Sequence, residues 1–86
     1  MAVYKVFFRK SVAKDLEDIP KSDVKKIMSR IRDLSLNPRG HGCEKLSGRD
    51  AYRIRQGRYR VVYSIHDDVL NVWVVKIAHR KDVYRQ

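Results

Sequence analysis

The feature of this sequence that most constrains its fold is a pair of alternating segments separated by Gly57-Arg58. Tyr52–Gln56 and Tyr59–His66 each alternate side chains of opposite character, a period of two that is typical of β-strands with one buried face. A two-residue loop that begins with glycine is a favoured connection between antiparallel strands. We therefore predict a β-hairpin in which the residues on either side of the loop pair with each other.

The predicted pairing assigns every side chain of the hairpin to one of two faces. Arg55 lies directly opposite Arg60, and Arg53 lies two residues away on the same face, which we call the arginine face. The other face is apolar and suited to receive helices; it carries Tyr52, Ile54, Tyr59, Val61, Tyr63 and Ile65. Like charges directly opposite each other destabilise a sheet by up to about 1 kcal/mol, so the arginine face needs an explanation.

Two interpretations of the arginine face are open. In the first, the arginine stems cover the sheet and their charged heads extend into water. In the second, the guanidinium groups bind an anion. Asp50 is the only acidic residue between Lys45 and Arg60, so the neighbouring sequence offers no further counter-charge. We expect the counter-charge to come from a ligand.

Charge and chemistry favour phosphate as that anion. The chain has 20 Lys and Arg residues against 10 Asp and Glu, a formal net charge of +10, which favours nucleic acid ahead of an acidic protein or an anionic membrane surface. A guanidinium donates two parallel hydrogen bonds to phosphate, and several together can stabilise the charge that grows during phosphoryl transfer. Arginine stays protonated, so a general base has to come from another residue.

The first half of the chain predicts one strand followed by two helices. Residues 1–8 have strand composition, and apolar residues at helical spacing predict helices over residues 12–19 and 24–34. A proline follows each helix and prevents its continuation. Ser11 and Ser22 are the predicted N-caps, because a serine hydroxyl can accept from an orphan N–H of the first turn.

A further strand completes the predicted sheet. Residues 69–77 form the third strand of an antiparallel meander after a two-residue turn at Asp67-Asp68. This turn places Trp73 and Val75 beside the arginines as an apolar floor. The predicted fold is α+β: an N-terminal strand, a two-helix hairpin, a three-stranded antiparallel meander joining one sheet, and a short basic C-terminal tail. We expect residues 1–86 to form a single domain.

Several other classes of protein are disfavoured. No apolar run approaches the roughly 20 residues of a membrane span, so we expect a cytoplasmic protein with no membrane partner. Cys43 is the only cysteine, which rules out an internal disulfide. The spacing of Cys43 and the histidines His41, His66 and His79 matches no common metal-ligand pattern, so we expect neither a metal nor a cofactor.

Short sequence motifs occur along the whole chain, in addition to the predicted order of strands and helices. They are Lys14-Asp15-Leu16, Asn37-Pro38-Arg39, Lys45-Leu46-Ser47-Gly48, Tyr52-Arg53-Ile54-Arg55, Tyr59-Arg60-Val61-Val62-Tyr63 and His79-Arg80-Lys81-Asp82-Val83-Tyr84. Taken in order, they resemble the RelE/ParE superfamily of bacterial and archaeal toxins from toxin–antitoxin pairs. The resemblance implies a RelE-like fold and, for the RelE branch, a ribonuclease that cleaves messenger RNA in the ribosomal A site without a metal.

The resemblance also implies roles for individual residues. In the family mechanism the 2′-hydroxyl attacks the adjacent phosphate, which leaves a 2′,3′-cyclic phosphate and a 5′-hydroxyl. Arg80 would support the leaving oxygen, and Tyr84 would stack on a base or share in proton transfer. The implied catalytic residues are Arg53, Arg55, Arg60, Arg80 and Tyr84, and we expect RNA contacts from Lys45, Arg58 and Lys81.

This chain departs from the best-characterised RelE enzymes at the position of a possible proton acceptor. Those enzymes carry lysines where this sequence has Arg53 and Arg55, and arginine does not readily accept a proton. The candidates that remain are Tyr84, whose phenol nearby arginines would acidify, and His79, because histidine titrates nearest to neutral pH. Both also have structural interpretations, His79 as a solvated strand-end residue and Tyr84 as a packing aromatic.

The implied partners are a cognate antitoxin, the ribosome and the messenger RNA in its A site. The antitoxin should contain an amphipathic segment with acidic residues that neutralises the basic face, which gives a toxin–antitoxin hetero-oligomer. Two alternatives stay open: a ParE-like DNA gyrase inhibitor of the same fold, and a non-catalytic nucleic-acid-binding module. The RelE branch is favoured because an inhibitor that binds a protein does not need a converged phosphate site.

Overall fold

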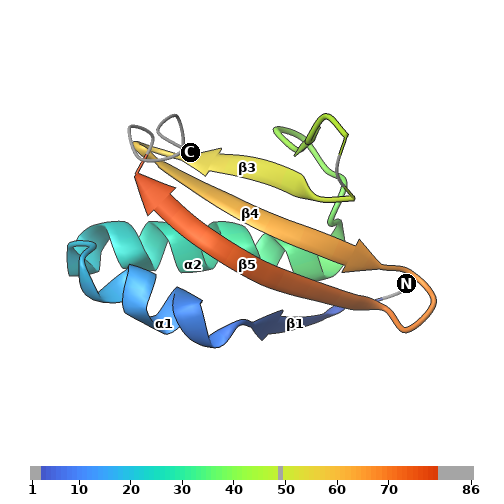
Figure 1. Ribbon diagram of the computed structural model, residues 1–86, viewed down its shortest axis with the longest axis horizontal. Coiled ribbons are helices and arrows are strands. Elements are labelled where there is room, and N and C mark those ends of the chain that lie inside the picture. The colour runs from blue at the N-terminus through green and yellow to red at the C-terminus, as the bar shows by residue number, and fades with distance from the viewer. Residues whose placement is uncertain (1–2, 49, 80–86) are drawn as a thin grey trace.

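The computed structural model describes residues 3–48 and 50–79 and has the predicted α+β fold. Its elements are β1 (Lys5–Phe8), α1 (Lys10–Glu17), α2 (Lys21–Leu36), β2 (Glu44–Lys45), β3 (Tyr52–Gln56), β4 (Tyr59–His66) and β5 (Asn71–His79). The five strands form one sheet in the order β1-β5-β4-β3-β2, with β1 parallel to β5 and the other neighbours antiparallel. In Figure 1, α2 runs behind the sheet and α1 lies beside β5. The predicted basic tail, residues 80–86, lies outside the described residues.

Both helices begin before the serines that were predicted to cap them. The N-cap residues are Arg9 and Pro20, and neither helix has a side-chain cap hydrogen bond. The Arg9 N–H donates to the Val74 carbonyl at 3.0 Å, so hydrogen bonding to the sheet continues up to the residue at which α1 starts. Ser11 and Ser22 therefore lie within the first turns of their helices, and the predicted caps are wrong.

The predicted register of the β3–β4 hairpin is confirmed. Gln56 pairs with Tyr59 and Arg55 with Arg60, and Gly57 in the turn has φ +60°, a conformation that costs glycine little. The residues predicted to face the helices are buried in the core or pack against it. They meet the buried helix residues Val12, Ile27, Ile31 and Leu34.

The connection between β4 and β5 differs from the prediction. His66 pairs with Asn71, so the loop consists of residues 67–70 and not of Asp67-Asp68 alone. The pairing of β5 is therefore shifted by two residues. A shift of two keeps each side chain on its face of the sheet, and Trp73 stays on the arginine face as expected.

A β-bulge changes the face of the last part of β5. Val62 pairs with Lys76 but Tyr63 pairs with Val74, which leaves Val75 as an extra residue on β5. In a regular strand with the predicted turn, Lys76 would lie on the core side of the sheet. The bulge places it opposite Val62, on the arginine face.

Candidate functional site

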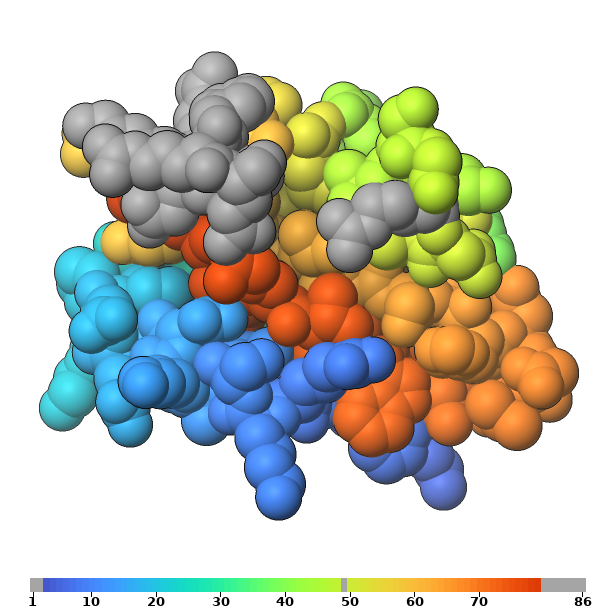
Figure 2. Space-filling view, in the orientation of Figure 1, coloured from blue at the N-terminus to red at the C-terminus, as the bar shows by residue number. Residues whose placement is uncertain are grey.

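The arginine face contains a groove of about 620 Å³. Figure 2 looks onto this side of the molecule, where the orange and red surfaces of β4 and β5 lie between the blue N-terminal segment and the yellow-green segment that precedes β3. The β1–α1 junction, the segment after β2 and strands β3 to β5 all contribute side chains to the groove. The lining residues are Arg9, Ser11, Leu46, Asp50, Ala51, Arg53, Arg60, Val62, Ser64, Val75 and Lys76.

Arg60 is the most constrained cation of the groove. Its exposed fraction is 3%, and it is the only charged residue that is buried within residues 3–48 and 50–79. β4 fixes its position, with Arg55 on one side and the small residue Ala78 on the other. A guanidinium held this far from water is not a solvated surface group, so for Arg60 the interpretation of a solvated basic face is ruled out.

Arg53 lines the same groove but has a carboxylate partner that the sequence analysis missed. Its side chain is 16% exposed and forms an ion pair with Glu44. Strand β2, which was not predicted, places Glu44 directly opposite Arg53. The expectation that the neighbouring sequence supplies no counter-charge is therefore wrong, because Glu44 lies just outside the interval that begins at Lys45.

The remaining predicted cations of the hairpin region do not enter the groove. Arg55 is exposed and faces Arg60 in the register, but it is not among the lining residues. Lys45 and Arg58 are exposed on β2 and in the hairpin turn. The structure thus brings together two of the three hairpin arginines, Arg53 and Arg60, and leaves Arg55 on the same face outside the groove.

Two cations of the groove were not predicted, Arg9 and Lys76. Arg9 follows Phe7 by two residues, so the period of two along the first strand is a signal that could have placed it on this face. Lys76 depends on the bulge, for which the sequence has no signal. The Ile77 N–H beside the bulge donates to Asp15 Oδ2 of α1 at 3.2 Å, so α1 holds this part of β5 in place.

His79 is not brought to the groove. It pairs with Tyr59, and the two rings meet edge to face with centroids 5.4 Å apart. Tyr59 packs against the core, so His79 lies on the helix side of the sheet. The predicted site residues Arg80, Lys81 and Tyr84 lie outside the described residues.

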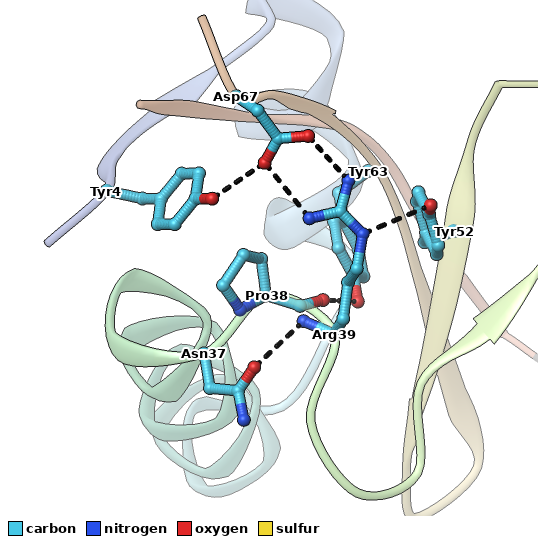
Figure 3. A network of polar contacts seen from close by, with 7 residues as sticks. All are labelled: Tyr4, Asn37, Pro38, Arg39, Tyr52, Tyr63 and Asp67. Atoms are coloured by element: carbon cyan, nitrogen blue, oxygen red, sulfur yellow. Dashed lines mark hydrogen bonds and ion pairs between the residues drawn. The ribbon is translucent and has the colours of Figure 1, made fainter. Parts of the chain in front are cut away.

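A separate polar network surrounds Arg39, on the segment after α2 (Figure 3). Arg39 donates two hydrogen bonds to Asp67, from Nη1 at 3.0 Å and from Nη2 at 2.7 Å. Its Nε donates to the Tyr52 hydroxyl at 3.3 Å, and the Tyr4 hydroxyl donates to Asp67 at 2.7 Å. The network ties together the residue before β1, strand β3, the segment after α2 and the β4–β5 loop.

The surroundings of Asp67 and Tyr63 shift the pKa values of both side chains. Hydrogen bonds from Arg39 and then from Tyr4 lower the pKa of Asp67 from 3.8 to about 2. Burial is the main cause that raises the pKa of Tyr63 above its usual value. The Tyr63 hydroxyl donates to the Pro38 carbonyl at 2.7 Å and contacts Cys43 Sγ at 2.9 Å. Tyr63 is therefore a neutral hydrogen-bonding group that fastens the segment after α2 to β4.

The described part of the chain shows neither a metal-ligand cluster nor a helix that could span a membrane. Within residues 3–48 and 50–79, no group of three or more His, Cys, Asp or Glu side chains is placed to hold a metal ion. No helix among these residues is long and apolar enough to cross a membrane. The groove residues instead offer guanidinium, ammonium and hydroxyl donors, which are groups that bind phosphate.

Comparison with protein families decides the assignment of the fold. The family described as "ParE toxin of type II toxin-antitoxin system, parDE" matches residues 6–84. The chain belongs to the RelE/ParE toxins. Among individual relatives, a putative toxin RelE1 of Methanocaldococcus jannaschii is 35% identical, with 95% of this chain and 96% of that protein covered. The toxin RelG of Mycobacterium tuberculosis is 30% identical, with 96% and 98% covered.

Solved structures of RelE/ParE toxins share this architecture. The toxin in the archaeal RelE–RelB complex from Pyrococcus horikoshii superposes with a TM-score of 0.77 at 28% identity, covering 93% of this chain and 97% of that chain. The toxin–antitoxin complex RelBE2 from Mycobacterium tuberculosis gives a TM-score of 0.80 at 26% identity, with 91% and 99% covered. The order of elements predicted from the sequence is thus that of the RelE toxins.

Proposed function

We propose that this chain is a toxin that inhibits translation as a ribosome-dependent endoribonuclease. The observation that carries the proposal is the groove of the arginine face, where the buried guanidinium of Arg60 is joined by Arg53 and Lys76. Such a set of cations matches the negative charge that grows on a phosphodiester during cleavage. Relatives named RelE toxins, at 35% and 33% identity, support the same assignment.

The proposed reaction needs no metal. The 2′-hydroxyl of one nucleotide loses its proton, and its oxygen attacks the adjacent phosphorus. The P–O5′ bond breaks and the 5′-oxygen takes up a proton, which gives a 2′,3′-cyclic phosphate and a 5′-hydroxyl. Arg60 and Arg53 would stabilise the charge on the non-bridging oxygens, and Arg55 would contact the flanking backbone. Arg80 and Tyr84 keep the roles that the family implies, at the leaving oxygen and at a base.

Two carboxylates lie close enough to the groove to be considered as the proton acceptor. Asp50 lines the groove, and Glu44 contacts the guanidinium of Arg53. A carboxylate can accept the proton of the 2′-hydroxyl, which arginine cannot. The variants Asp50→Asn and Glu44→Gln test the two: loss of the acceptor should remove the acidic limb from the pH dependence of cleavage, and the other variant should keep it.

We also propose an antitoxin as the protein partner, in a toxin–antitoxin hetero-oligomer. The solved relatives from Pyrococcus horikoshii and Mycobacterium tuberculosis are complexes of a toxin with its antitoxin. An acidic amphipathic segment would neutralise the groove and exclude RNA from it. Co-expression with the cognate antitoxin should restore growth and abolish cleavage, and purified complex should regain cleavage when the antitoxin is removed.

A ParE-like inhibitor of DNA gyrase is the second candidate function, because the matching family is described as a ParE toxin. The two candidates differ in what they damage. Brief induction followed by primer extension should reveal cuts within codons of translated messages if the chain is a ribonuclease. Intact messages together with DNA damage would support the gyrase inhibitor, and an absence of toxicity would leave only a nucleic-acid-binding module.

A further inference from the structure

A stacked aromatic pair lies on the arginine face beside the groove. Phe7 of β1 and Trp73 of β5 pair in register, and their rings stack with centroids 4.9 Å apart and planes inclined by 21°. Phe7 is 37% exposed and Trp73 is half-buried. Trp73 lies opposite Ser64, which lines the groove. The aromatic pair therefore adjoins the groove along the surface of the sheet.

This pair does not belong to the hydrophobic core. Val72 and Val74, on either side of Trp73, are fully buried, so Trp73 points away from the helices. Phe8 faces the other way from Phe7, since it lines an apolar groove between β1 and α2. Among residues 3–48 and 50–79 both helices pack against the opposite face of the sheet, so the stacked rings are left at the surface.

We propose that Phe7 and Trp73 form a platform on which a base of single-stranded RNA stacks while the phosphates of the strand lie in the groove. Aromatic side chains beside a cationic groove are a general means of holding single strands. Arg60 and Ser64 are four residues apart on β4, about 13 Å along the strand. The stacked base is therefore a few nucleotides away from the phosphate at Arg60.

Charge favours a nucleic-acid strand as the occupant of the platform and groove. Arg9 follows Phe7 by two residues, directly after β1 ends, and it lines the groove together with Lys76 of β5. An RNA strand that leaves the platform towards Arg60 thus passes one cation at the end of β1 and one on β5. The inference rests on the proposed function for the identity of the ligand, but it does not require cleavage.

Trp73 is the only tryptophan of the chain, so its fluorescence reports directly on the platform. The probe is a 2′-O-methyl RNA oligonucleotide of about six nucleotides, which lacks the attacking hydroxyl and cannot be cleaved. We expect saturable quenching by this oligonucleotide and none by an abasic strand with the same backbone. The proposal is overturned if the oligonucleotide does not quench, or if the abasic strand or an acidic peptide quenches equally.

Two neighbouring variants provide a matched comparison, since Phe7 and Phe8 are 37% and 39% exposed on opposite faces. Phe7→Leu should weaken binding of the base-containing oligonucleotide at least about fivefold, the low end of base–aromatic stacking. It should leave binding of the abasic strand unchanged. Phe8→Leu should change neither. Equal losses in both variants would assign the effect to the folding of β1 and would overturn the proposal.

Cleavage on translating ribosomes is measured separately, so the two proposals can fail independently. Base-dependent quenching without any cleavage supports the platform and rejects the ribonuclease. Cleavage without base-dependent quenching keeps the ribonuclease and rejects the platform.

Discussion

Two arginines in different regions of the molecule are placed in opposite electrostatic surroundings. The Arg39 side chain is 45% exposed, yet Asp67 binds it through two hydrogen bonds and Tyr52 accepts a third. Arg60 is 3% exposed, yet the described groove residues around it carry three more cations against one carboxylate, with Glu44 at the edge. The exposed arginine is bound by one carboxylate and one hydroxyl, whereas the buried one lies among the cations that, in the proposed function, bind the phosphate.

The largest effect is expected when the buried charge of Arg60 is removed. Arg60→Ala should lower the rate of ribosome-dependent cleavage by about 100- to 1,000-fold, the usual cost of losing one donor to a developing oxyanion. Lys26→Ala, which removes an exposed cation of α2 on the other side of the sheet, should leave the rate nearly unchanged. Circular dichroism of both variants should show the spectrum of the folded protein. Full cleavage by a folded Arg60→Ala protein would remove the groove from the mechanism.

The second variant tests whether the bulge matters for function. Lys76→Met should lower cleavage by about 10- to 100-fold, because hydrogen bonds to charged groups contribute about 1.5–3 kcal/mol. Lys76→Arg keeps the charge and should retain most of the rate. The measurement is single-turnover cleavage at saturating ribosome concentration. If Lys76→Met and Lys76→Arg lower the rate of cleavage equally, a positive charge at this position is not sufficient. The lysine would then act through its size or by transferring a proton.

The third variant lies in the Arg39 region. It should lower the stability of the fold without changing the rate of cleavage. Tyr63→Phe removes the hydrogen bond to the buried Pro38 carbonyl, which should lower the free energy of unfolding by about 1–2 kcal/mol. Urea denaturation measures the loss. Cleavage per folded molecule should match that of the unchanged protein, and a specific loss of cleavage would show that the two regions are coupled.

The smallest expected effect is a pH dependence of stability. Because the pKa of Asp67 is lowered from 3.8 to about 2, the unfolded chain takes up this proton at a higher pH than the folded protein does. The stabilisation is therefore fully present above about pH 4 and is lost as the pH falls through about 2. Thermal unfolding between these pH values should show a shallower loss of Tm in Asp67→Asn than in Asp68→Asn.

The parts of the fold that the sequence predicted are those set by local, periodic signals. The turn at Gly57 fixed the pairing of Arg55 with Arg60, and alternation then assigned both faces of the hairpin. Helical spacing located both helices, although it did not locate their first residues. Hydrogen bonding between Arg9 and β5 sets the start of α1. Such a contact between segments far apart in the chain cannot be predicted from the local sequence.

Strand β2 and the β-bulge were not predicted, because neither produces a periodic pattern in the sequence. Strand β2 has two residues, too few to show a period, so the partner of Arg53 was not foreseen. The bulge at Val75 adds one residue inside an almost continuous apolar run, where no polar residue marks the change of face. Both features are decided by pairing between strands, and both alter which charges meet in the groove.

The extra residue at position 75 allows β5 to present both an aromatic ring and an ammonium group on the same face of the sheet. In a regular strand, residues three apart point to opposite sides, so Trp73 and Lys76 would be separated by the thickness of the sheet. With Val75 inserted between them, the aromatic ring and the ammonium group emerge on one surface while Val74 and Ile77 remain inside. Deleting Val75 would leave these four residues in regular alternation with Lys76 still on the arginine face. If Val75 were instead kept and paired with Val62 in a regular strand, Lys76 would turn to the core side and Ile77 would take its place on the arginine face.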